Sequence, residues 1–170
     1  MKKIMVLLSF VCAVLLGNEL ETAFKAHKAG DYQKAFKHFK IACDNGNYKG
    51  CGFLGALYYN GQGVRQNYKE AFKYYKLACD NGEYIGCYNL GLLYRNGQGV
   101  EQNYKEAFKY FKIACDNGVN CGCNNLGFLY ESGRGVRQSY STAKEYYGKA
   151  CDLGAQEGCD VFADLNQKGY

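Results

Sequence analysis

Proline and tryptophan are missing from this 170-residue chain, and histidine and methionine occur only twice each. Glycine, by contrast, occurs 22 times. An all-β chain of this length would normally use some proline in turns and at sheet edges, so this combination favours helices that end at glycine. With His27 and His38 as the only histidines, a metallohydrolase site is disfavoured, and we expect no metal or other cofactor.

Charge of a single sign and long apolar runs are also scarce. The chain has 21 Lys and Arg against 16 Asp and Glu, and 48% of its residues are hydrophobic. This hydrophobic fraction is too high for a disordered chain, and the charges spread along the sequence exclude a polytopic membrane protein. The mildly basic balance indicates no particular partner. Because acidic residues accompany the lysine-rich segments, we expect no nucleic-acid binding.

The one long apolar run lies at the start of the chain. It covers residues 4–16, follows two lysines, and gives way to small and polar residues at Gly17. This order is typical of a signal peptide, which we predict over residues 1–17. A retained anchor is the less favoured alternative, because a spanning helix needs roughly 20 apolar residues. The mature protein is therefore expected to be secreted, either periplasmic or extracellular, and not to contact a membrane.

After residues 18–28, which are predicted to form a capping helix, one motif is repeated four times. The copies have a period of 36 residues, and the last is two residues short. Such periods are typical of solenoid proteins, because a single copy cannot bury its own apolar face and must stack on a neighbour. The predicted repeats are residues 29–64, 65–100, 101–136 and 137–170.

Each copy contains two helical segments. In the second copy, apolar residues follow Tyr68 at spacings of three and four residues, which places them on one face of a first helix. A second, shorter helix comes after Gly82 and ends at Gly97, and both glycines are predicted to be left-handed C-caps. A Gly-x-Gly-Val connection leads to the next copy. The sequence thus predicts an all-α fold of stacked helical hairpins.

A cysteine pair recurs in every copy. Its members are eight residues apart, one at the end of the first helix and one at the start of the second. Antiparallel helices joined by a short turn bring such positions within reach of a disulfide, which an exported protein can form. Zinc binding is the alternative, although zinc ligands are usually two to four residues apart. The predicted disulfides are Cys43–Cys51, Cys79–Cys87, Cys115–Cys123 and Cys151–Cys159.

Cys121 has no partner in this scheme and is predicted to be a free thiol. It occupies the position of Lys49, Ile85 and Glu157 in the other copies. It is either a drifted surface residue or a reactive thiol that exchanges with Cys123 or links two chains.

The segment Leu-Gly-x-Leu-Tyr-x-x-Gly-x-Gly-Val, with the Tyr-x-x-Ala and Ala-Cys positions of the following helix, resembles Sel1-like repeats, which are relatives of tetratricopeptide repeats. That resemblance implies a right-handed α/α solenoid. The Cys-x7-Cys pair resembles the Helicobacter cysteine-rich protein family of secreted helical proteins. This second resemblance implies penicillin binding with slow β-lactamase activity toward a β-lactam or peptidoglycan-like molecule. The alternative that it implies is a non-enzymatic scaffold that binds host or envelope proteins or peptides.

The residues themselves offer one candidate pair for hydrolysis. A serine β-lactamase needs a serine at a helix N-terminus and a lysine one turn later that can take the hydroxyl proton. Ser141 and Lys144 have this spacing, but the companion motifs Ser-Asp-Asn and Lys-Thr-Gly are missing. In repeat register the pair replaces Lys69 and Phe72, so a capping or surface role is the alternative.

Binding is the other candidate activity. The concave face of such a solenoid is lined mainly by first helices, and tyrosine provides a large contact area at low entropic cost. Asn89 and Asn125 on second helices are predicted to contact an extended peptide backbone. Core or rim roles for the tyrosines are the alternative. The predicted groove comprises the exposed positions His38, Tyr74, Tyr110 and Tyr146 beside Lys37, Lys73, Lys109 and Glu145.

Overall fold

The computed structural model describes residues 18–170, which form two compact units. The first unit ends at Asn81, and the second runs from Gly82 to Tyr170. The predicted signal peptide lies outside the described part of the chain.

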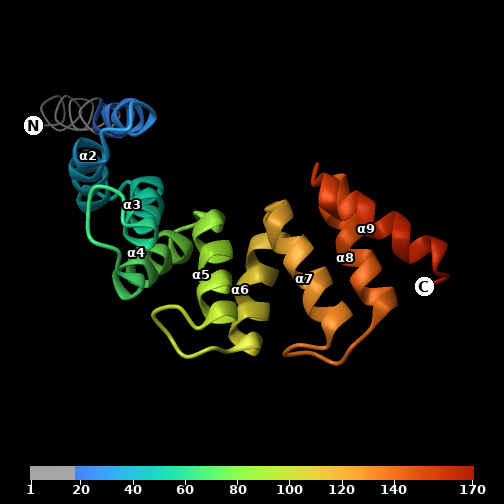
Figure 1. Ribbon diagram of the computed structural model, residues 1–170. Coiled ribbons are helices and arrows are strands. Elements are labelled where there is room, and N and C mark those ends of the chain that lie inside the picture. Colours follow the sequence, from blue (N-terminus) through green and yellow to red (C-terminus); the bar gives the residue numbers. More distant parts are fainter. Residues whose placement is uncertain (1–17) are drawn as a thin grey trace, which may run out of the picture. The chain divides into compact units, whose positions relative to one another are not determined.

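All regular secondary structure in residues 18–170 is helical (Figure 1), which confirms the all-α prediction. Within these residues, no helix is both long and apolar enough to cross a lipid bilayer. The first unit contains the helical residues 18–28, α2 (Tyr32–Asp44), α3 (Tyr48–Asn60) and α4 (Tyr68–Asp80). The second contains α5 (Tyr84–Asn96), α6 (Tyr104–Asp116), α7 (Asn120–Ser132), α8 (Tyr140–Asp152) and α9 (Gln156–Gln167).

Capping residues set the helix boundaries. Before α6, the side chain of Asn103 accepts hydrogen bonds from the backbone amides of Lys105 and Glu106 at 3.0 and 3.1 Å. After α5, Gly97 has a φ of 68°, a left-handed conformation in which a side chain would be strained. The prediction for Gly82 is off by one position, because Asn81 is the C-cap of α4 and Gly82 follows it with a φ of 89°.

The core of the first unit is built from aromatic and aliphatic side chains of α2 and α3. Phe39, Leu54 and Leu57 are fully buried. Phe24, from the helical residues 18–28, contacts Phe39 and Phe53 edge-to-face with ring centroids 5.3 and 4.7 Å apart. The N-terminal helical segment thereby covers apolar surface that the α2–α3 hairpin would otherwise expose.

In the second unit, consecutive helices from α5 to α9 pack side by side (Figure 1). Phe111 of α6 is fully buried there. Gly91 of α5 permits this packing, because a Cβ at that position would lie 2.5 Å from two carbons of the Phe111 ring. The missing side chain offsets the helix-propensity cost of glycine, which is about 1 kcal/mol relative to alanine.

Alanine at Gly91 is therefore expected to lower the free energy of unfolding by about 1–3 kcal/mol, the usual cost of overpacking. Gly52 of α3 is the matched control, because a Cβ there would meet only the Ala78 Cβ at an ordinary 3.8 Å. Gly52→Ala should leave stability unchanged or raise it by up to about 1 kcal/mol. Urea unfolding followed by circular dichroism measures both. Equal losses of stability would contradict a tight contact at Gly91.

A buried ring occupies one equivalent position on every first helix, as Phe39, Tyr75, Phe111 or Tyr147. Burial raises the pKa of Tyr75 and of Tyr147 above the ordinary tyrosine value. The Tyr147 hydroxyl also donates a hydrogen bond to Glu131 at 2.7 Å, which raises its pKa further. The folded protein therefore favours the uncharged phenol at both positions.

Because both pKa values are raised on folding, the stability they contribute is present below the unfolded-state pKa of about 10 and is lost as the pH rises above it. We expect the free energy of unfolding to fall between about pH 9 and pH 11.5. The double variant Tyr75→Phe/Tyr147→Phe should flatten this decline, since phenylalanine already fills the equivalent position in the other two repeats. The exposed Tyr84 gives the control Tyr84→Phe, and a decline identical in all variants would refute the assignment. Cys121 is alkylated beforehand to prevent thiol exchange.

Candidate functional site

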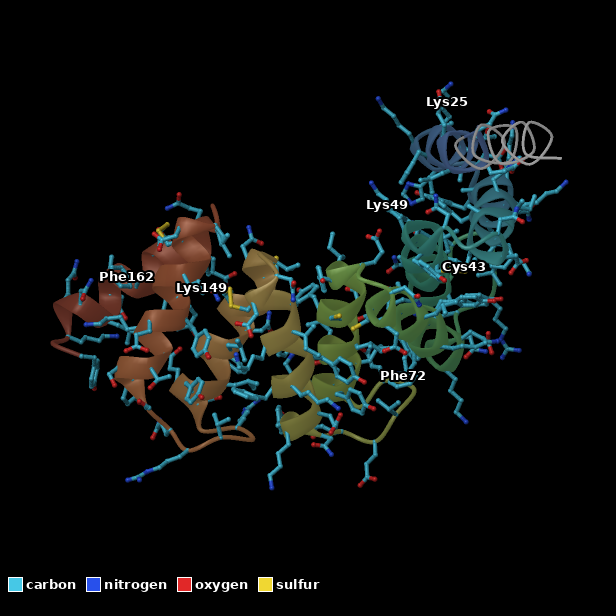
Figure 2. All side chains as sticks on the ribbon, turned by 180° about the vertical axis from the view of Figure 1, so that it is seen from behind. Lys25, Cys43, Lys49, Phe72, Lys149 and Phe162 are labelled. Atoms are coloured by element: carbon cyan, nitrogen blue, oxygen red, sulfur yellow. A yellow bond between two sulfur atoms is a disulfide. The ribbon has the colours of Figure 1, made fainter. Side chains whose placement is uncertain are left out.

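In the hairpins α2–α3, α6–α7 and α8–α9, a disulfide joins the two helices at the turn. Cys43 and Cys51 are bonded with their Cα atoms 4.7 Å apart (Cys43 is labelled in Figure 2). The pairs Cys115–Cys123 and Cys151–Cys159 have the same sequence separation and Cα distances of 4.6 Å. Cys79 and Cys87 are also disulfide-bonded. Oxidised sulfur is not a thiolate ligand, so these cysteines form structural bridges and not a zinc site.

The bridge imposes a glycine on the residue that precedes its second cysteine. A Cβ at Gly122 would lie 2.9 Å from the Ala114 Cβ, the Cys115 nitrogen and the Phe111 carbonyl oxygen. Two of these three atoms belong to helix backbone and cannot move aside. Gly50 and Gly158 meet the equivalent atoms at 2.9 to 3.3 Å. The Gly-Cys dipeptide is thus a single structural element, which the sequence interpretation overlooked.

Cys121 is a free, exposed cysteine on α7. Cys123 is fully buried in its disulfide. Two residues apart on an α-helix correspond to about 200° around the axis, so the Cys121 thiol is directed away from that bridge. The folded protein therefore does not support the thiol–disulfide exchange between Cys121 and Cys123 that the sequence left open.

Iodoacetamide should label Cys121 within minutes in the native, oxidised protein. Of the bridges in the second unit, Cys151–Cys159 is half-buried and Cys115–Cys123 fully buried, so graded reduction should release the former first. Mass spectrometry of the tryptic peptides 113–134 and 150–168, which contain these five cysteines, locates each label. Labelling at Cys115 or Cys123 before reduction would overturn the bridge assignment.

Ser141 and Lys144 are not assembled as a catalytic pair. The N-cap of α8 is Ser139, whose hydroxyl accepts the backbone amide of Thr142 at 3.2 Å, so Ser141 lies inside the first turn. The Ser141 hydroxyl shares a 3.3 Å hydrogen bond with that of Ser139. The Lys144 ammonium donates instead to the backbone carbonyl oxygen of Tyr170. Ser141 is therefore exposed at the surface, and no hydrogen bond orients its hydroxyl toward Lys144.

The groove tyrosines form stacked pairs that join neighbouring repeats. Each stacks on a tyrosine of the preceding second helix, with ring centroids 5.5 or 5.6 Å apart and planes within 10° of parallel. The expectation that these rings are exposed is wrong, because the partner ring covers one face: Tyr110 is 8% exposed and the other two are half-buried. The pairs are Tyr58–Tyr74, Tyr94–Tyr110 and Tyr130–Tyr146.

His38, the fourth predicted groove position, is also occupied. Its Nδ1 lies 2.6 Å from Glu19 Oε2, and both side chains are half-buried. This contact ties α2 to the helical residues 18–28. His38 therefore contributes to the packing of the first unit and does not line an open groove.

Lysines surround the stacked pairs in both units. Lys73 lies over the Tyr74 ring at 5.4 Å, and Lys109 lies over Tyr110 at 5.5 Å. A glutamate three residues earlier pairs with each of these lysines at 3.7 Å. We call these two sets the lysine–tyrosine patches: Tyr58, Lys73 and Tyr74 in the first unit, and Tyr94, Lys109 and Tyr110 in the second.

Further ion pairs border the stacks. Lys112 donates to Asp116 at 2.6 Å, and this hydrogen bond raises the pKa of Lys112 and lowers that of Asp116. Lys149, labelled in Figure 2, approaches the same carboxylate at 3.5 Å. Lys112 therefore stays charged in the neutral range, and both lysines lie on first helices of the second unit.

The amide of Asn125 is committed within the protein. Its Oδ1 accepts a 2.6 Å hydrogen bond from Arg95, and its Nδ2 donates to the Cys121 carbonyl oxygen at 2.8 Å. It is thus unavailable to a peptide backbone, contrary to expectation. Asn89 is half-buried on α5. Asn124, which the sequence interpretation passed over, donates to Glu157 at 2.8 Å.

Comparisons with known proteins agree with this architecture. The Sel1 repeat profile matches residues 16–47, 49–83, 85–119 and 122–154. The structure of c5321, described as a protective antigen of uropathogenic Escherichia coli with an SLR fold, is similar with a TM-score of 0.85. It is 30% identical, and the similarity covers 91% of this chain and 34% of c5321. Helicobacter pylori cysteine-rich protein B (HcpB) gives a TM-score of 0.62 at 31% identity, over 77% of this chain and 94% of HcpB.

Sequence similarity to curated proteins is local. "Putative beta-lactamase HcpE" of Helicobacter pylori is 52% identical over 46 residues, which are 27% of this chain and 13% of HcpE. The chain thus spans about an eighth of the length of that relative. Fold and repeats define a disulfide-bonded protein of Sel1-type hairpins, and the chain belongs to the Sel1 repeat family. Its cysteine pairs and its similarity to HcpE and HcpB place it among the cysteine-rich Hcp-type members.

Proposed function

We propose that this protein is a non-catalytic, extracytoplasmic binding module that holds a protein or peptide partner on its lysine–tyrosine patches. The observation that carries the proposal is the recurrence of one surface arrangement in both units. In each, an ammonium group lies over a tyrosine ring that is itself held in place by a second tyrosine. The ammonium groups of Lys73 and Lys109 are exposed, and donors held in a fixed position beside partly exposed tyrosine are typical of protein-binding surfaces.

The proposed compartment rests on the disulfides. Bridges persist in secreted, periplasmic and cell-surface proteins, whereas cytosolic thiols are kept reduced. The predicted signal peptide at residues 1–17 agrees with export. A partner would then be another envelope or extracellular protein, or a host protein.

Hydrolysis of β-lactams is less well supported by the residues of this chain. The name of HcpE suggests such an activity for that protein, of which this chain spans about an eighth. Here Lys144 bonds to Tyr170 and not to Ser141, so no base is positioned to activate that hydroxyl. Enzymatic turnover is therefore the competing hypothesis that the functional test must address.

The binding test uses a random 12-residue peptide library selected on the oxidised protein, followed by calorimetry with the selected peptides. Lys73→Glu/Lys109→Glu removes one ammonium from each patch, and the fourth repeat already has Glu145 at this position. We expect the double variant to weaken binding at least fivefold. Lys49→Glu reverses the charge on a second helix, where the fourth repeat has Glu157, and should change affinity less than twofold (Lys49 is labelled in Figure 2).

Nitrocefin turnover and fluorescent-penicillin labelling are measured on the same samples. We expect neither, and no difference between the native protein and Ser141→Ala. Turnover that disappears in Ser141→Ala would establish the enzymatic alternative. Peptides that bind the double variant and the native protein equally well would reject the lysine–tyrosine patches as the binding surface.

A further inference from the structure

The second unit contains a polar cleft of about 510 Å³ at the edge where the connections between repeats lie. In Figure 1 these connections, after α5 and after α7, are the loops at the bottom of the second unit. The cleft is formed by the end of α5, the start of α6, the middle of α7 and the loop after α7. Its lining residues are Arg95, Asn96, Gln102, Tyr104, Phe128 and Arg134.

Arg134 is held in the cleft by two aromatic rings. Its guanidinium carbon lies 5.5 Å from the centroid of Tyr104 and 5.5 Å from that of Phe128. One of its nitrogens also donates to the Tyr104 hydroxyl at 3.3 Å. These contacts hold the guanidinium group beside the two rings, and its remaining N–H groups can bind a carboxylate in bidentate geometry.

Arg95 supplies a second oriented cation. Its Nη1 donates to Asn125 at 2.6 Å and its Nε to Asn96 at 3.3 Å. The Arg95 carbonyl accepts a 2.8 Å hydrogen bond from Gln102, which also donates to the Tyr104 hydroxyl at 3.3 Å. The side chain is therefore held by neutral amides, and these do not neutralise its charge.

Neither arginine has a carboxylate partner among residues 18–170. The ion pairs in that part of the chain involve lysine or His38, and the cleft is lined by no aspartate or glutamate. Two guanidinium groups thus line one cavity with their charge unpaired. An anion is the missing complement.

The cleft is a local departure from the repeat. Arg134 stands where the first two repeats have Gln62 and Gln98, and Phe128 stands where they have Ala56 and Leu92. Packing does not require these two residues, since Phe128 is an exposed large hydrophobic side chain and Arg134 is exposed. Phe128 is on α7 and Arg134 is in the loop after α7, yet both side chains line the same cleft.

We propose that this cleft binds the carboxylate of a peptide, either a free C-terminus or an aspartate or glutamate side chain. The two guanidinium groups take the carboxylate, and the exposed Phe128 ring takes an adjacent apolar side chain. This site is separate from the lysine–tyrosine patches, so it stands or falls independently of the proposed function.

The test follows the arginine Nε–Hε resonances of the 15N-labelled full chain by NMR during titration with acetylated tripeptides. One probe is Gly-Phe-Ala with a free C-terminus, one is Gly-Glu-Phe amide, and the neutral control is Gly-Gln-Phe amide. We expect saturable shifts of Arg95 and Arg134 with a carboxylate probe and none with the control. Tighter binding of the first or of the second probe identifies the source of the carboxylate.

Arg134→Gln restores the residue of the first two repeats and should weaken the carboxylate probe at least fivefold, with the backbone spectrum outside the cleft unchanged. Arg137→Gln removes the same charge from the same connection outside the cleft lining, and it should change affinity less than twofold. The proposal is overturned if no probe shifts these resonances up to 20 mM. It is equally overturned if the neutral peptide or inorganic phosphate binds as tightly as the carboxylate probes, or if both variants weaken binding alike.

Discussion

The covalent bond across each hairpin turn is the constraint on which the packing of this chain depends. A single 36-residue repeat has too little apolar surface to stay folded alone. Closing a loop of eight residues contributes about 2.5 kcal/mol in the chain-entropy description, which is similar to burying one large apolar side chain. The bridge also sets the distance between the two helix backbones. Gly122 must lack a side chain at that distance, and the register of α6 against α7 follows.

Periodicity made the architecture predictable, because helix spacing, capping residues and the eight-residue cysteine interval are local features that recur in each copy. The burial of the stacked tyrosines was harder to predict from the sequence. A helical wheel places Tyr110 at the margin of its apolar face, but it does not reveal that Tyr94 of the preceding helix covers the ring. The N-cap of α8 could not be assigned from the sequence, because Ser139 and Ser141 are both serines near the start of the helix. Asn125 is saturated by Arg95, a residue 30 positions away that occurs at this place in one repeat alone.

Repeated and unrepeated positions have different physical roles. Residues that recur in every copy fill the core, close the turns or stack between neighbours. Among the recurring groups, the lysine ammonium groups beside the stacks stay exposed. Arg134 and Phe128 deviate from the repeat and leave the packing unchanged, so their charge and apolar surface remain available to other molecules. In a protein whose fold is encoded several times over, such deviations indicate a binding surface that the repeat itself does not encode.

The position of the bridges also determines how the chain extends under mechanical tension. The cysteines of a pair are eight positions apart in the sequence, and the Cα atoms of Cys115 and Cys123 are 4.6 Å apart. A fully stretched segment of that length would span about 27 Å, so each bridge shortens the reach of an unravelled repeat by about 20 Å. The turn would stay closed while the helices on either side pulled out. When the tension is released, refolding would start from hairpin turns that the disulfides have kept closed.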